Sequence, residues 1–122
     1  MVRALYRGPA HVIVDASPKF LALTGDVLGK PAREAFAEPE YAPAQRAMDR
    51  VFETGIPEAM LIDGFDGIPG VIVYAPLIEP ESRQVVGLQS LWRPLPVPLG
   101  TARPASRRQG PGLVLLAGRR DA

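Results

Sequence analysis

The chain has 122 residues, of which 47% are hydrophobic and 22% charged, and its formal net charge is +1. This length suits a single globular domain, and the absence of cysteine excludes disulfides, thiolate metal sites and cysteine nucleophiles. No apolar run is long enough to cross a membrane and Met1 is not followed by a signal peptide, so we expect a cytoplasmic protein without membrane partners.

Two short strands are expected at the start of the chain, over residues 2–6 and 10–15, and a short helix follows them. Ser17 is a residue type that caps helix N-termini, and Pro18 suits the first helical position. Gly25 favours the end of this helix, because glycine readily adopts the left-handed conformation that is common there.

After short helical turns over residues 26–38, the clearest predicted helix covers residues 43–54. Pro43 suits its first turn, and Gly55 followed by Pro57 ends it. Apolar residues recur at three- and four-residue spacing and form one stripe: Ala44, Ala47, Met48, Val51 and Phe52. The remaining polar residues are expected on the solvent-exposed side: Gln45, Arg46, Asp49, Arg50 and Glu53.

Three further strands are predicted over residues 58–63, 69–78 and 84–92, with turns at 64–67 and 79–83. The element order is therefore two strands, short helices, one longer helix and three strands. It predicts an α+β fold, with a five-stranded antiparallel sheet and the helices packed on one of its faces.

Residues 1–93 are expected to form the domain, and residues 94–122 a flexible tail rich in Pro, Gly and Arg. The domain has a net charge of −3, which disfavours nucleic-acid binding, whereas the tail carries +4. Arg107-Arg108 and Arg119-Arg120 fit a solubilising tail better than a nucleic-acid or lipid site. The apolar run at 112–118 is either a strand that docks on this domain or on a partner, or it is accidental.

Several short segments of residues 2–93 occur in a characteristic order and spacing. They are Asp15-Ala16-Ser17-Pro18, Leu23-Thr24-Gly25, Leu28-Gly29-Lys30-Pro31, Arg33-Glu34-Ala35-Phe36, Arg50-Val51-Phe52-Glu53-Thr54-Gly55, Tyr74-Ala75-Pro76-Leu77 and Val85-Val86-Gly87. Together they resemble a PAS domain of the bacterial signalling type. The resemblance implies a sensory module that is not an enzyme and that acts as a homodimer or by docking on a signalling partner.

Two positions depart from the pattern of that family. Ser17 stands where asparagine is usual, but serine caps a helix about as well. Arg93-Pro94-Leu95-Pro96 stands where the family has the Asp-Val/Ile-Thr ending that couples the last strand to an effector helix. Because proline cannot extend a helix, the usual relay is altered here.

The resemblance also implies a small cavity between the sheet and the helices, where many PAS domains hold a cofactor or metabolite. Covalently attached flavin is excluded because the chain has no cysteine. Haem is not expected, because residues 43–54 contain no histidine and the single histidine, His11, lies on an early strand. We expect His11 to be a partly exposed strand residue that makes one hydrogen bond, and we expect no metal site.

Two sets of residues are candidates for binding. The candidate cavity lining is Met48, Val51, Phe52, Met60, Ile62, Val73, Leu88, Ser90 and Trp92, with Ser90 as its polar contact. The candidate interface on the other sheet face is Ile72, Tyr74, Gln89 and Leu91. Ordinary core packing explains the first set at least as well, and a half-exposed sheet explains the second equally well.

The sequence therefore favours a sensory module that dimerises or docks on a partner and is modulated by a small ligand. The alternative is a receptor in which occupancy by a non-covalent cofactor or metabolite is the whole signal. A small α+β enzyme ranks last, because its candidate carboxylates fall in turns, where they usually solvate loops: Asp63, Asp66, Glu79 and Glu81.

Overall fold

The computed structural model describes residues 2–63 and 68–95. Its strands form one antiparallel sheet: β1 (Val2–Arg7), β2 (Val12–Ala16), β3 (Glu58–Asp63), β4 (Pro69–Ile78) and β5 (Val85–Pro94). The strand order is β2-β1-β5-β4-β3, so the first and last of the described strands pair at the centre of the sheet. This arrangement confirms the predicted five-stranded antiparallel sheet.

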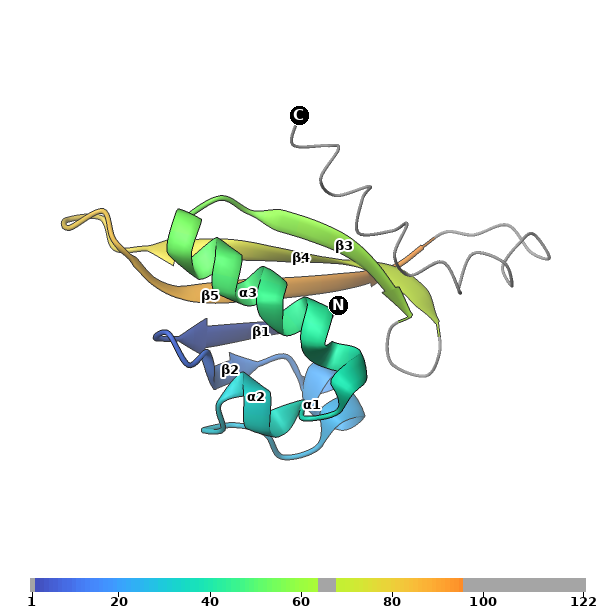
Figure 1. Ribbon diagram of the computed structural model, residues 1–122. Coiled ribbons are helices and arrows are strands. Elements are labelled where there is room, and N and C mark those ends of the chain that lie inside the picture. Colours follow the sequence, from blue (N-terminus) through green and yellow to red (C-terminus); the bar gives the residue numbers. More distant parts are fainter. Residues whose placement is uncertain (1, 64–67, 96–122) are drawn as a thin grey trace.

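All the described helices lie between β2 and β3 in the sequence. They are α1 (Pro18–Thr24), α2 (Ala32–Ala35), the 3-10 helix η1 (Pro39–Tyr41) and α3 (Ala42–Thr54). They cover one face of the sheet, and α3 runs along β4 and β5 (Figure 1). None of these helices is both long enough and apolar enough to span a bilayer.

The helix boundaries follow from local chemistry. Ser17 caps α1, because its hydroxyl accepts a hydrogen bond from the Phe20 amide at 3.3 Å. The same hydroxyl accepts from the Arg3 amide at 3.1 Å, which ties the start of α1 to β1. At the other end of the helical layer, Gly55 adopts a φ of 73° and its amide donates to the Val51 carbonyl, so α3 stops where predicted.

Two boundaries differ by two residues from the sequence prediction, and the others agree to within one residue. The second strand begins at Val12 rather than at residue 10, because residues 8–11 form a turn in which His11 has a φ of 55°. The last strand continues to Pro94, and the Leu95 amide donates to the Pro69 carbonyl at 3.0 Å. The predicted turn at 64–67 and the predictions for residues 96–122, including the run at 112–118, lie outside the described residues.

The core fills the space between the helical layer and the sheet. Its buried apolar residues are Val2, Ala4, Tyr6, Ile13, Phe20, Val27, Ala32, Ala47, Met48, Val51, Met60, Ile72, Tyr74, Leu88 and Trp92. Gly87 is needed where β5 meets β1, because a Cβ there would collide with the Tyr6 carbonyl. The predicted polar side of α3 is wrong at one position, since Gln45 is only 6% exposed.

Candidate ligand cavity and outer sheet face

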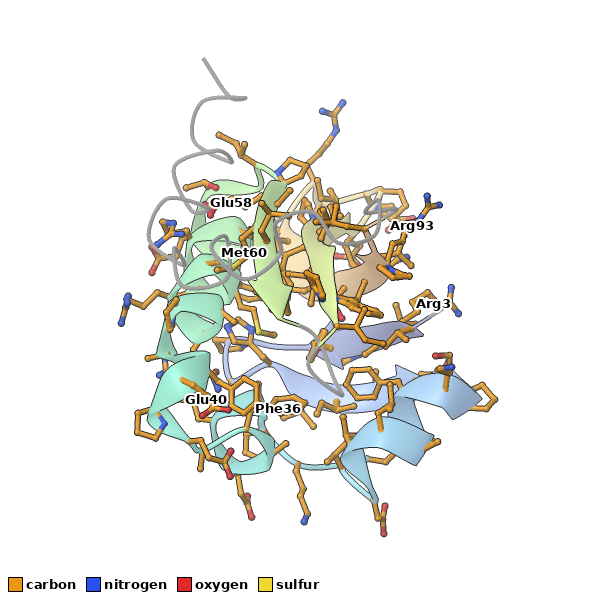
Figure 2. The ribbon with its side chains drawn as sticks, turned by 90° about the vertical axis from the view of Figure 1, so that its right-hand side faces the viewer. Arg3, Phe36, Glu40, Glu58, Met60 and Arg93 are labelled. Atoms are coloured by element: carbon orange, nitrogen blue, oxygen red, sulfur yellow. The ribbon has the colours of Figure 1, made fainter. Side chains whose placement is uncertain are left out.

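A cavity of about 70 Å³ lies in the layer between α3 and the sheet. It is lined by Tyr6, Phe20, Phe36, Tyr41, Ala44, Gln45, Met48, Ile62, Ile72 and Tyr74. Half of these residues are aromatic, and none carries a formal charge at neutral pH. Figure 2 shows Phe36 on the helical side of the sheet, below the start of α3.

The sheet side of the cavity carries hydroxyl groups that remain neutral. The hydroxyls of Tyr6 and Ser90 share a buried hydrogen bond of 2.9 Å, and Tyr74 is paired directly with Ser90 across β4 and β5. Burial raises the pKa of Tyr6 to about 12, against a smaller opposing effect of its bond to Ser90. Burial and the neighbouring Tyr6 raise the pKa of Tyr74 as well.

On the α3 side of the cavity, the side-chain amide of Gln45 forms only part of the hydrogen bonds that it could make. Gln45 Nε2 donates to the backbone carbonyls of Ala32 at 3.2 Å and Phe36 at 3.0 Å. These two acceptors fix the orientation of the amide, because the opposite orientation would set its oxygen against both carbonyls. Gln45 Oε1 is buried and has no hydrogen-bond partner among the described residues.

The structure divides the predicted cavity residues into three groups. Met48 and Ile62 lie in the cavity wall. Others pack in the core outside this wall: Val51, Phe52, Met60, Leu88, Ser90 and Trp92. Val73 is 36% exposed, so its predicted inward direction is wrong. Whether any of them binds a ligand stays a prediction.

Two predicted interface residues on the same strand also face the opposite side of the sheet from the one expected. Ile72 and Tyr74 were expected on the outer face, but they are 8% and 4% exposed and lie in the cavity wall. The cause is the strand register, in which Ile72 pairs with Trp92 and Tyr74 with Ser90. Residues paired across two strands share a face of the sheet, so both follow their inward-facing partners on β5.

Sequence reasoning missed most of the cavity wall, namely Tyr6, Phe20, Phe36, Tyr41, Ala44 and Gln45. One signal was available in β1, where residues with the parity of Val2 and Ala4 are small or apolar and Tyr6 shares that parity. No periodicity marks Phe36 or Tyr41, because they stand in the irregular connection between α2 and α3.

The face of the sheet opposite the helices is apolar at its centre. We define the outer face by the uncharged residues that the register places at its centre: Leu5, Ala59, Leu61, Val71, Val73, Ala75, Gln89 and Leu91. Arg3 and Arg93 project from this side of the sheet, away from α3 (Figure 2). No helix of the described residues covers it (Figure 1). Gln89 and Leu91 lie on this face, and whether they form an interface stays a prediction.

The prediction for His11 is wrong in exposure and in secondary structure. The residue is 1% exposed and lies in the turn before β2. Its side chain makes one hydrogen bond, to Asp49 on α3, and one is the number that was expected. Within residues 2–63 and 68–95, no three His, Cys, Asp or Glu side chains come together in a way that could hold a metal ion.

Neither a family model nor a curated protein matches this chain, but solved structures do. A sensory box histidine kinase of Vibrio cholerae matches with a TM-score of 0.66 and 16% identity, over 79% of this chain and 82% of that one. The PAS domain of the histidine kinase ThkA matches with a TM-score of 0.59 and 18% identity, over 75% of this chain and 98% of that one.

A third similar structure is VqmA of Vibrio cholerae, described as a dimer and a LuxR-type receptor, with a TM-score of 0.62 and 20% identity. The match covers 77% of this chain but 45% of VqmA, so the chain spans about half the length of that protein. The element order, the sheet and these structural matches together show that the chain has the PAS fold.

Proposed function

We propose that this chain is a sensory PAS module of a bacterial signalling system, which pairs with a second copy of itself through the outer face. In this proposal a small molecule in the cavity modulates the pairing, the protein acts in the cytoplasm, and it binds rather than catalyses. The observation that carries the proposal is the apolar outer face, which no helix of the described residues covers.

The size of the outer face supports a docking role. With strands about 4.8 Å apart and side chains on one face about 6.6 Å apart along each strand, its residues extend over roughly 300–400 Å². The largest apolar patch on a monomeric protein typically covers about 300–600 Å², and such a patch is often functional. A symmetric pair would bring Val73 and Leu91 of both copies together at the centre and leave Arg3 and Arg93 towards the rim.

The packing of α3 on the sheet connects the cavity to the proposed interface. Met48 on α3 lies in the cavity wall, and α3 packs on the inner side of β4 and β5. The outward residues of these same two strands, including Val73 and Leu91, form the centre of the outer face. A ligand that favours one packing of α3 would therefore change the relative population of two sheet arrangements, and with it the pairing.

The alternative function is a receptor whose occupancy is the whole signal. The cavity itself favours it, because its wall is largely apolar and includes the neutral polar side chains of Tyr6, Gln45 and Tyr74. The structurally similar VqmA has been solved bound to a ligand, DPO. At about 70 Å³ the cavity is well below the 300–1,000 Å³ typical of cofactor sites, which supports a small metabolite over a haem or flavin.

The proposal is tested by sedimentation of the full chain and of two variants that carry the same change. Val73→Arg places a charge at the centre of the outer face, whereas Leu28→Arg places one at a 45% exposed leucine in a loop of the helical layer. We expect the unmodified chain and Leu28→Arg to form dimers and Val73→Arg to be a folded monomer. A monomeric unmodified chain, or a dimer that both variants retain, would refute pairing through this face.

A further inference from the structure

The two edges of the sheet differ in how their backbone groups are paired. At the β2 edge, the Ile13 amide donates to the Lys30 carbonyl at 3.0 Å, and the Gly29 amide donates to the Ile13 carbonyl at 2.7 Å. Val12 forms a bridge to Pro31 as well, so this segment covers the β2 edge. At the opposite edge lies β3, and among the described residues no backbone group outside β4 pairs with it (Figure 1).

β3 also lacks the features with which proteins usually protect a free edge. Its sequence, Glu-Ala-Met-Leu-Ile-Asp, contains no lysine and no proline, and its pairing with β4 runs without a bulge. The residues between its two acidic ends are all apolar. Such an edge is a template for a further strand, because each unpaired N–H and C=O group can join a new ladder.

A second copy of β3 is not a suitable partner for this edge. Two β3 strands paired antiparallel in full register would set Glu58 of each copy opposite Asp63 of the other. Like charges placed directly opposite each other destabilise a strand pair. The edge therefore favours a strand that carries no acidic residue.

The chain itself contains a segment with this property. Residues 112–118, which lie outside the described part of the chain, read Gly-Leu-Val-Leu-Leu-Ala-Gly, and their length is close to that of β3. A short apolar run bounded by glycines is consistent with a strand. Arg119 and Arg120 follow the run, whereas β3 has only acidic charged residues, so the two segments are complementary in charge.

The position of Leu95 brings this segment within reach of the free edge. The Leu95 amide donates to the Pro69 carbonyl at 3.0 Å, and Pro69 pairs with Asp63 on β3. A strand added beyond β3 would lie three strand spacings, about 14 Å, from β5. A linker of about 16 residues, the length of 96–111, spans roughly 20 Å as a random coil and up to about 50 Å when extended.

We propose that residues 112–118 add to β3 of the same chain as a sixth, antiparallel strand. The strand begins beside Asp63, at the end of the sheet where the chain leaves β5, and completes the hydrogen-bonding ladder of β3. By occupying the edge, it keeps β3 from pairing with other chains. This inference depends neither on the cavity nor on pairing through the outer face.

Hydrogen exchange of the full chain, followed residue by residue by NMR, tests the proposal. A strand at a free edge protects only the amides that point toward its neighbour, so alternate amides of residues 59–62 would exchange rapidly. We expect all of these amides to be protected in the unmodified chain. Rapid exchange at alternate positions would overturn the proposal.

Two proline substitutions in the full chain identify the segment that covers the edge. Leu115→Pro removes a backbone donor in the middle of residues 112–118 and is expected to speed exchange of the outward amides of β3 by about tenfold or more. Leu99→Pro makes the same change in the linker and is expected to leave this exchange unchanged. Unaltered protection of β3 in Leu115→Pro would mean that another segment covers the edge, which refutes the proposal.

Dilution separates pairing within one chain from exchange of the segment between two copies. The measurement is made on Val73→Arg, the variant expected to be monomeric, so that pairing through the outer face does not contribute. Protection of β3 that stays constant over a tenfold dilution supports pairing within one chain, because the local concentration of a tethered segment does not depend on that of the protein. Protection that is lost on dilution would show that the segment comes from a second copy and would contradict the proposal.

Discussion

His11 and Asp49 are joined by a hydrogen bond of 2.8 Å between Nε2 and Oδ1, across a separation of 38 residues. His11 lies in the turn before β2 and Asp49 on α3, so the bond fastens the long helix to the start of the sheet. Arg33 on α2 donates to the other carboxylate oxygen of Asp49 at 2.6 Å, so α2 is joined to α3 at the same side chain. The ring of His11 also packs edge to face on Phe52, with the ring centres 5.8 Å apart.

The substitution Asp49→Ala is therefore expected to destabilise the fold. It leaves both ring nitrogens of His11 buried without a partner, since Nδ1 already has none among the described residues. The loss of a bond to a charged group and the burial of an unsatisfied donor predict a decrease of about 2–3 kcal/mol in the free energy of unfolding. Urea denaturation followed by circular dichroism measures it.

The matched control is Glu53→Ala, one turn further along α3 at an exposed position. An exposed substitution of this kind changes the free energy of unfolding by about 0.5 kcal/mol or less. Similar losses in the two variants would mean that the bond between His11 and Asp49 contributes nothing specific.

Stability should fall in alkaline solution because of the buried tyrosines. The pKa of Tyr6 is raised from 10.0 to about 12 in the folded chain. Below pH 10 the Tyr6 phenol is protonated in both the folded and the unfolded chain, and its contribution to the free energy of unfolding is fully present. Between pH 10 and about 12 the unfolded chain releases this proton and the folded chain retains it, so the free energy of unfolding falls as the pH rises.

The expected slope is at most about 1.4 kcal/mol per pH unit for each such tyrosine. Tyr6→Phe removes one titrating group, so its free energy of unfolding should fall less steeply than that of the unmodified chain. Urea denaturation of both proteins from about pH 8 to pH 11 gives the two slopes. Parallel curves would show that Tyr6 ionises equally easily in both states.

The fold could be predicted from the sequence because its signals are local. Ser17 and Pro18 mark the start of α1, and Gly55 marks the end of α3, and the structure agrees at each point. The spacing of Met48 and Val51 identified the buried side of α3 correctly. Such features depend on a few neighbouring residues, so they can be recognised in a single sequence.

The cavity could not be predicted to the same extent, because it depends on the register between distant strands. β4 is apolar at nearly every position, so its alternation does not reveal which residues face inward. Only the pairing with Trp92 and Ser90 on β5 decides that Ile72 and Tyr74 do. Gln45 was misassigned for a related reason, because its partners, the carbonyls of Ala32 and Phe36, lie at the two ends of the short helix α2, whose position beside α3 is set by tertiary packing.

Native mass spectrometry of the freshly purified full chain tests the central claim most directly, because it reports the oligomeric state and any bound molecule together. The account predicts a dimer, with a small additional mass in a fraction of the protein that is lost on denaturation. A bare monomer at every concentration would contradict both the pairing through the outer face and the occupancy of the cavity.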